Sequence, residues 1–217
     1  MDKRHRVTLM LVVHFFRRFF DNDTLQVDGD TLTTVVRAIS VVAAPGLVVA
    51  FFLQNQYWRS PLWSTITDQY FFILISFVVM GAVAIFEWEM LFPDRLDFLV
   101  LTPLSLKPLQ LLAAKALALI AFLALFLVSC NFFGALILPA LRNGSFFRQF
   151  YPHLIAVLLA GIFAALFFLA LGGALLCVLG AARFRIISPI MQMLSVTGLV
   201  LLMLQYAKYG DAMQALL

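Results

Sequence analysis

Charged residues are scarce in this sequence: Asp, Glu, Lys and Arg make up 12% of its 217 residues. A soluble domain normally carries about 25%. Hydrophobic residues make up 64% of the chain, well above the usual share of about 45–50%. This composition excludes an ordinary soluble enzyme, a disordered chain and a disulfide-stabilised secreted module. It indicates a protein with several membrane-spanning helices.

Cysteine and histidine are also rare. Cys130 and Cys177 both lie in apolar runs, which favours a packing role for both over a disulfide or a metal site. His5, His14 and His153 lie in different segments, and the sequence contains no HExxH motif and no cluster of His, Cys and carboxylates. We therefore expect no metal centre and no cofactor.

Motifs for nucleotide hydrolysis and nucleophilic catalysis are missing as well. The sequence has no Walker A loop and no GxSxG motif. No acidic residue lies in the middle third of a predicted span, which argues against a proton- or sodium-coupled transporter. We expect a protein that is not an enzyme and has no ATPase site of its own.

Long apolar runs are abundant. A spanning helix needs about 20 apolar residues, and the runs are continuous rather than alternating, which favours helices over a barrel. The predicted fold is an all-α polytopic membrane helix bundle, a single transmembrane domain over residues 1–217. Its expected spans are about 31–53, 69–90, 109–138, 154–182 and 186–206.

The distribution of Lys and Arg predicts the orientation, since basic residues concentrate on the cytoplasmic side. If the N-terminus is cytoplasmic, more Lys and Arg residues lie on the inner side of the membrane than on the outer side, and the C-terminus lies outside. We expect a multi-pass protein of the bacterial inner (plasma) membrane, and the net charge of +4 then does not indicate nucleic acid as a partner. The inner residues are Lys3, Arg4, Arg6, Arg17, Arg18, Arg95, Lys107, Lys115, Arg183 and Arg185, and the outer ones are Arg59, Arg142, Arg148 and Lys208.

Residues 7–20 precede the first span and are too short to cross a membrane. Their phenylalanines recur at helical spacing, and Arg17 and Arg18 follow most of the apolar residues. We predict a helix in the inner interface, with its aromatic side chains among the acyl chains and its arginines at the headgroups. It is either a plain anchor or an elbow helix that docks a partner.

The loop between the second and third predicted spans interrupts the apolar pattern with charges and prolines. Pro93 can open a short helix, and Thr102-Pro103 ends it because the residue before proline avoids helical geometry. Pro108 is placed to open the third span. The loop therefore predicts a short helix parallel to the membrane surface. Its charged residues, with those just before it, are Glu87, Glu89, Asp94, Arg95 and Asp97.

Four charges mark the inner membrane boundary: Arg37, Glu87, Glu89 and Lys115. A carboxylate near the apolar boundary is costly unless it reaches water or a cation. Glu87 is expected to pair with Lys115 or Arg37. The alternative is that each side chain reaches the headgroup region independently.

Polar and small residues within the spans indicate helix packing. Asn131 and Gln192 are more often helix–helix contacts than ligands. In the fourth span, small residues repeat four apart and predict an interior helix. They are Ala160, Gly161, Ala164, Ala165, Ala170, Gly173, Ala174, Cys177 and Ala181.

The segment from Asp94 to Ser105, DRLDFLVLTPLS, resembles the coupling region of the permease subunits of ABC-2 type transporters. The family's acidic coupling-helix position corresponds to Asp97, its proline to Pro103, and its lysine to Lys115, about two residues later than usual. Asp94 stands where the family has glycine. The helix at 7–20, with Arg17 and Arg18, resembles the family's elbow helix. The resemblance covers the first three spans well and the last two loosely.

The resemblance implies a membrane-spanning permease subunit of an ATP-driven exporter. Its implied partners are a separate ABC ATPase, a second permease unit in a homo- or heterodimer, and membrane lipids. A coupling helix would transmit motion from the ATPase through Asp94, Arg95, Asp97, Phe98, Thr102 and Pro103. The family has six spans, so either the sixth is absent, or the chain is part of a larger permease, or a re-entrant turn lies in a long run. The alternative function is a non-transporting membrane scaffold or assembly subunit.

Overall fold

The computed structural model describes residues 3–20, 31–56, 64–88, 108–141 and 145–216. These residues form five helices and no strand: α1 (Lys3–Phe20), α2 (Thr31–Gln56), α3 (Ser64–Glu87), α5 (Pro108–Leu141) and α6 (Phe146–Leu216). Three of the helices contain stretches long and apolar enough to cross a membrane, Thr67–Glu87, Leu109–Leu141 and Phe146–Tyr206. The described part of the chain is thus an all-α membrane helix bundle.

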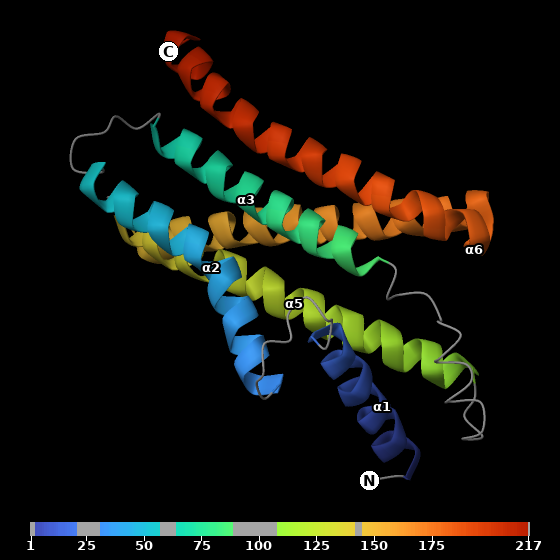
Figure 1. Ribbon diagram of the computed structural model, residues 1–217. Helices are drawn as coiled ribbons and strands as arrows, with labels where there is room; N and C mark the ends of the chain where they lie inside the picture. Colours follow the sequence, from blue (N-terminus) through green and yellow to red (C-terminus); the bar gives the residue numbers. More distant parts are fainter. Residues whose placement is uncertain (1–2, 21–30, 57–63, 89–107, 142–144, 217) are drawn as a thin grey trace.

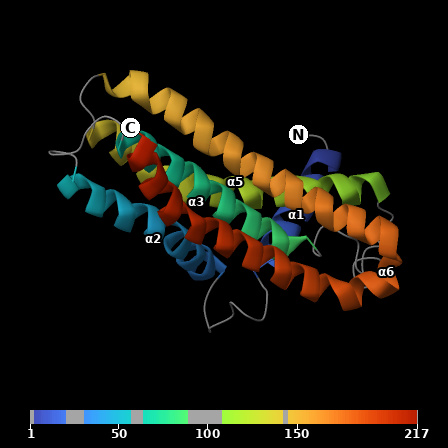
Figure 2. The same ribbon diagram turned by 90° about the horizontal axis from the view of Figure 1, so that it is seen from above.

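Helix α6 consists of two arms joined at Gly180. The backbone there has φ 70° and ψ 160°, a conformation that only glycine adopts without strain. The arm after Gly180 runs back toward the other end of the bundle, antiparallel to the first (Figures 1 and 2). The single long element α6 is therefore a hairpin of two helices. The sequence predicts two separate spans in this region, at about 154–182 and 186–206.

The other predicted spans also fall on helices. Residues 31–53 lie within α2 and 109–138 within α5, which begins at Pro108 as expected. The helix ends differ from the approximate span bounds. Helix α3 begins at Ser64 and ends at Glu87, against the expected 69–90, and α6 begins at Phe146, eight residues before the expected fourth span, and turns at Gly180.

The arrangement brings one set of helix ends together. The C-terminal end of α3, the N-terminal end of α5 and the turn at Gly180 lie at the same end of the bundle, and α1 lies against the adjoining half of α5 (Figure 1). We call this the Gly180 end. Helix α3 packs chiefly against both arms of α6, and α2 packs chiefly against α5.

A buried polar contact joins three helices in the interior. Ser76 of α3 donates a hydrogen bond to the carbonyl of Val157 in α6 (2.7 Å), and the amide of Asn131 in α5 donates to the Ser76 hydroxyl (2.9 Å). Gly161 lies against the same serine. Lipid acyl chains offer no hydrogen-bond partner, so polar groups between membrane helices must find their partners within the protein. The prediction that Asn131 is a helix–helix contact is confirmed.

The small residues of α6 divide into two groups. Gly161, Ala164 and Ala165 are buried, whereas Ala170, Ala174, Cys177 and Ala181 are exposed. Within this chain the first half of the arm therefore has the predicted interior position, and in the second half these four side chains are uncovered. Cys130 is buried as expected, whereas the side chain of Cys177 is exposed in this chain. Gly172, in the same half of the arm, is nevertheless buried.

Candidate functional site

The predicted coupling segment lies outside the described residues. This applies to Asp94, Arg95, Asp97, Phe98, Thr102 and Pro103, and to the boundary residue Glu89. The structure does describe what holds the two ends of the segment. These ends are Trp88, directly after α3, and Pro108, the first residue of α5.

Trp88 anchors the end of α3 to both arms of α6. Its side chain is fully buried, and its indole Nε1 donates a hydrogen bond to the hydroxyl of Ser188 in the second arm (2.9 Å). The indole also packs on Gly172 of the first arm, where an added Cβ would lie 2.9 Å from the ring. Phe184 lies beside it, with ring centroids 6.5 Å apart. We call these four residues the Trp88 anchor.

Gln192 strengthens the same junction. Its Nε2 donates a hydrogen bond to the carbonyl of Ile85 (3.1 Å). Ile85 is in the last turn of α3, where the backbone carbonyls have no partner within the helix. The prediction that Gln192 is a helix–helix contact is confirmed. Trp88 and Gln192 together fix the end of α3 to the second arm of α6.

Sequence reasoning did not single out the Trp88 anchor. Tryptophan at the end of a span is normally assigned to the membrane–water interface, and nothing local distinguishes a buried one. Gly172, Phe184 and Ser188 lie roughly 84 to 100 residues further along the chain. Only the hairpin at Gly180 brings both arms of α6 to Trp88.

Helix α1 and the start of α5 form the second half of the site. Phe15, Phe19 and Phe20 of α1 are buried, and Phe19 and Phe20 each lie 5.1 Å from the Phe122 ring of α5. The prediction that these aromatic side chains lie among acyl chains is wrong for these three, because α5 presents its own aromatic surface to them. Helix α1 itself forms as predicted.

The boundary charges do not share one environment. Arg37 is exposed, whereas Glu87 and Lys115 are 8% and 7% exposed. The Lys115 ammonium lies 5.8 Å from the centre of the Phe15 ring, within cation–π range. Oε2 of Glu87 is buried and has no hydrogen-bond partner among the described residues. The expected pairing of Glu87 is therefore not seen at this oxygen.

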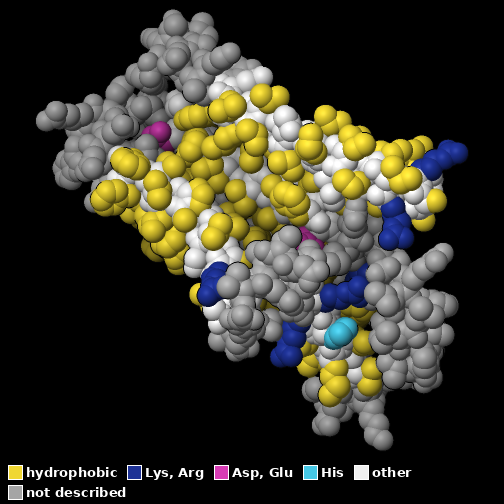
Figure 3. Space-filling model, viewed as in Figure 1, with side chains coloured by type: hydrophobic (Ala, Val, Ile, Leu, Met, Phe, Trp, Pro, Cys, Tyr) yellow, Lys and Arg dark blue, Asp and Glu magenta, His cyan; other side chains and the backbone are white. Residues whose placement is uncertain are grey.

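Basic side chains are unevenly distributed over the described surface. The space-filling view shows a broadly hydrophobic face, with Lys and Arg side chains in its lower and right-hand parts, some of them on the side where α6 turns (Figure 3). The described basic side chains of α1, the start of α2, the start of α5 and the residues just after Gly180 are Arg17, Arg18, Arg37, Lys115, Arg183 and Arg185. No group of three or more His, Cys, Asp or Glu side chains able to hold a metal occurs within the described ranges.

Comparison with protein-family models, curated proteins and solved structures found no match for this chain.

Glu87→Gln is expected to raise the free energy of unfolding by about 1 kcal/mol, because burying a carboxylate oxygen without a partner costs more than burying a neutral amide. Thermal unfolding of the purified protein in detergent measures the change. Destabilisation of 1 kcal/mol or more would instead show that the carboxylate makes a stabilising contact, as in the expected pairing with Lys115 or Arg37.

Proposed function

We propose that this chain is the membrane-spanning permease subunit of an ATP-driven exporter of ABC-2 type. In this proposal a separate ATPase docks on the segment between α3 and α5, and a second permease unit completes the translocation path. The N-terminus and the Gly180 end face the cytoplasm of a bacterial cell, where the basic side chains of that end satisfy the positive-inside rule.

The Trp88 anchor is the observation that carries the proposal. A segment that transmits force must be joined rigidly to the helices that it moves, because packed elements shift as bodies rather than deform. Trp88 contacts both arms of α6 through Gly172 and Ser188. A displacement of the segment would therefore move α3 and both arms of α6 together.

The other end of the segment supports the same reading. Helix α5 begins at Pro108, and it packs on α1 through Phe122 and Phe126. An ATPase acting on the segment would thus act on α5 and α1 through one junction and on α3 and α6 through the other. The elbow-helix resemblance of α1 agrees with this arrangement.

The double substitution Arg95→Ala with Asp97→Ala tests the proposal. It is expected to lower co-purification of an ATPase at least tenfold, since truncated charged contacts at an interface typically cost 2 kcal/mol or more. Affinity purification from the native host in mild detergent, with mass spectrometry, measures the bound ATPase. The double variant Arg183→Ala with Arg185→Ala, at the same end of the bundle, is the control.

The scaffold alternative predicts a different result from the same purification. A non-transporting assembly subunit would bring down membrane partners and no Walker-motif ATPase from any detergent. Undiminished ATPase binding by the Arg95/Asp97 double variant would exclude the coupling role of this segment.

A further inference from the structure

Glu87 is a buried carboxyl group at the end of α3. Its side chain is 8% exposed, and its Oε2 is buried with no hydrogen-bond partner among the described residues. Glu87 is also the last residue of α3, where the negative end of the helix dipole disfavours a second negative charge. An ionised carboxylate without a partner costs far more to bury than the neutral acid. The surroundings of Glu87 therefore favour the protonated carboxyl group.

The helices packed on α3 bring few charged side chains to it. These helices are α2, α5 and α6. Arg37 is the charged residue of α2, and Arg183 and Arg185 follow the turn of α6. All three arginines are exposed, as is the thiol of Cys177. None of these side chains donates a hydrogen bond to Oε2 of Glu87.

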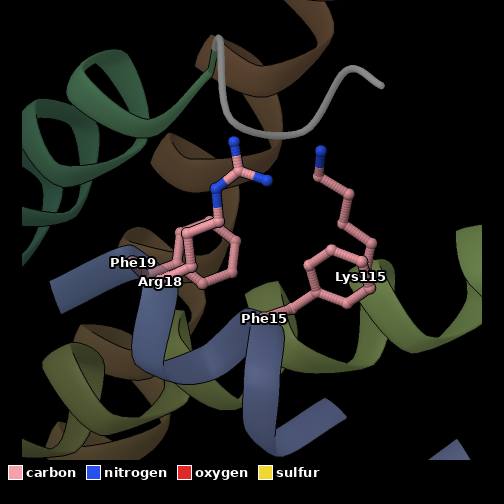
Figure 4. Close-up of a pocket in the computed structure, with 4 residues that line it drawn as sticks. All are labelled: Phe15, Arg18, Phe19 and Lys115. Atoms are coloured by element: carbon pink, nitrogen blue, oxygen red, sulfur yellow. The ribbon is translucent and has the colours of Figure 1, made fainter. Parts of the chain in front are cut away.

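Lys115 is the charged residue of α5, and it is engaged elsewhere. Its ammonium lies 5.8 Å from the centre of the Phe15 ring. Figure 4 shows Lys115 and Arg18 leaving their helices in the same direction, beside the two phenylalanine rings that border a small recess. Both cations make interactions within the chain, and neither donates a hydrogen bond to Oε2 of Glu87. The described cations thus leave this oxygen uncompensated.

We propose that Glu87 is a proton-binding site that controls the Trp88 anchor. A bound metal ion would need further ligands, and no group of three or more His, Cys, Asp or Glu side chains occurs in the described part of the chain. A proton needs only one carboxylate oxygen. The exposed edge of the side chain gives it access to water, from which the carboxylate takes up one proton and to which the neutral acid returns it.

Trp88 is the residue through which ionisation of Glu87 acts, because it follows Glu87 directly. An ionised side chain is drawn toward water, since the bundle offers it no counter-ion, and the end of α3 moves with it. The buried indole of Trp88 donates to the Ser188 hydroxyl over 2.9 Å and packs on Gly172, so such a movement weakens both contacts. Protonation therefore favours the closed anchor, and ionisation favours its release.

The full chain is expected to lose stability as the pH rises, because its folded state retains a proton that the unfolded state releases above the ordinary glutamate pH range of about 4.3. Glu87→Gln is neutral at every pH and should lack this contribution. Unfolding of both proteins is measured in detergent from about pH 5 to about pH 8. The ratio of the unfolding equilibrium constant of the full chain to that of the variant should rise about tenfold or more over this range.

Fluorescence of Trp88 reports the anchor itself. The chain has three tryptophans, so Trp58→Phe with Trp63→Phe leaves Trp88 as the single emitter. Its emission is expected to shift to longer wavelength as the pH rises over the same range, because the indole leaves its buried site. Adding Glu87→Gln should abolish the shift. Adding Asp68→Asn, which removes a half-buried carboxyl group at the other end of α3, should preserve it.

Three results would overturn the proposal. The first is constant Trp88 emission over this pH range in the single-tryptophan protein, a measurement that does not require the Glu87→Gln variant to fold. The second is an equal emission shift with and without Glu87→Gln, which would assign the response to another titratable group. The third is a Glu87→Gln effect on unfolding that is the same at every pH, as a purely structural role predicts. None of these measurements involves an ATPase, so the proposed transport function is tested separately.

Discussion

Trp88→Ala is expected to lower the free energy of unfolding of the bundle by about 3 kcal/mol. The value is at the lower end of the range for tryptophan truncation in a packed core, because between membrane helices the aqueous transfer contribution is missing and packing remains. The substitution removes the hydrogen bond to Ser188 and the packing on Gly172 and Phe184 at once. Thermal or denaturant unfolding in detergent measures the loss.

Two further variants separate these contributions. Trp88→Phe keeps most of the ring and removes the donor to Ser188, so we expect a loss of about 1 kcal/mol, the usual value of one hydrogen bond. Phe86→Ala, two residues earlier and 62% exposed, is the matched control and should change stability little. Equal effects of Phe86→Ala and Trp88→Ala would contradict the anchor.

The variant Trp88→Phe also tests the proposed function. If the Trp88 anchor transmits motion from an ATPase, Trp88→Phe should preserve ATPase binding and lower ATP-driven transport in reconstituted vesicles. A variant that weakens docking, such as Arg95→Ala with Asp97→Ala, should lower both. The two readouts thus separate attachment of the ATPase from transmission through the bundle.

Gly161→Leu is expected to prevent close packing of α3, α5 and α6, at a cost of about 3 kcal/mol, the upper part of the range for overpacking. A Cβ at this position would already lie 2.8 Å from the Ser76 hydroxyl and 3.0 Å from Met80 Cγ, and closer still to Leu127. A leucine would also separate Ser76 from the carbonyl of Val157. The result should be a large loss of monodisperse protein after detergent extraction.

Gly198→Leu is the matched control for this substitution. Gly198 lies in the second arm of α6, and nothing lies within 4 Å of a Cβ built there. Both variants replace a helical glycine with a strong helix former, so their intrinsic helix propensity changes equally. Differences between Gly161→Leu and Gly198→Leu in size-exclusion profile and unfolding midpoint therefore report on helix packing alone. Similar profiles for the two variants would argue against the close approach at Gly161.

Much of the fold could be read from the sequence, because a membrane restricts the choices. Continuous apolar runs can only be helices in lipid, and their lengths located α2 and α5 to within three residues at either end. Helix α6 contains both of the last two predicted spans but begins eight residues before the first and ends ten residues after the second. Pro108 opened α5 as its fixed φ favours. The amides Asn131 and Gln192 were assigned correctly to helix contacts, since a polar group in such a run must find a protein partner.

The candidate site was only partly predictable. Local patterns identified α1, and they placed Lys115 near the membrane boundary. They did not identify the aromatic surface of α5 that receives Phe19 and Phe20. They also placed Cys177 and the later alanines of α6 in the interior, whereas these side chains are exposed. Small residues permit close approach, but the sequence does not state which face another helix covers.

The sequence by itself determined that this protein is a membrane helix bundle, because hydropathy over 20 residues is a local property. The tertiary structure alone decided which residues meet at the Gly180 end. The positive φ of Gly180 folds α6 back on itself, and this turn brings Gly172 and Ser188 to Trp88. The packing of α1 on α5 likewise brings Arg18 and Lys115 to one recess. Both contacts join residues about 80 to 100 positions apart, and no local periodicity encodes such pairs.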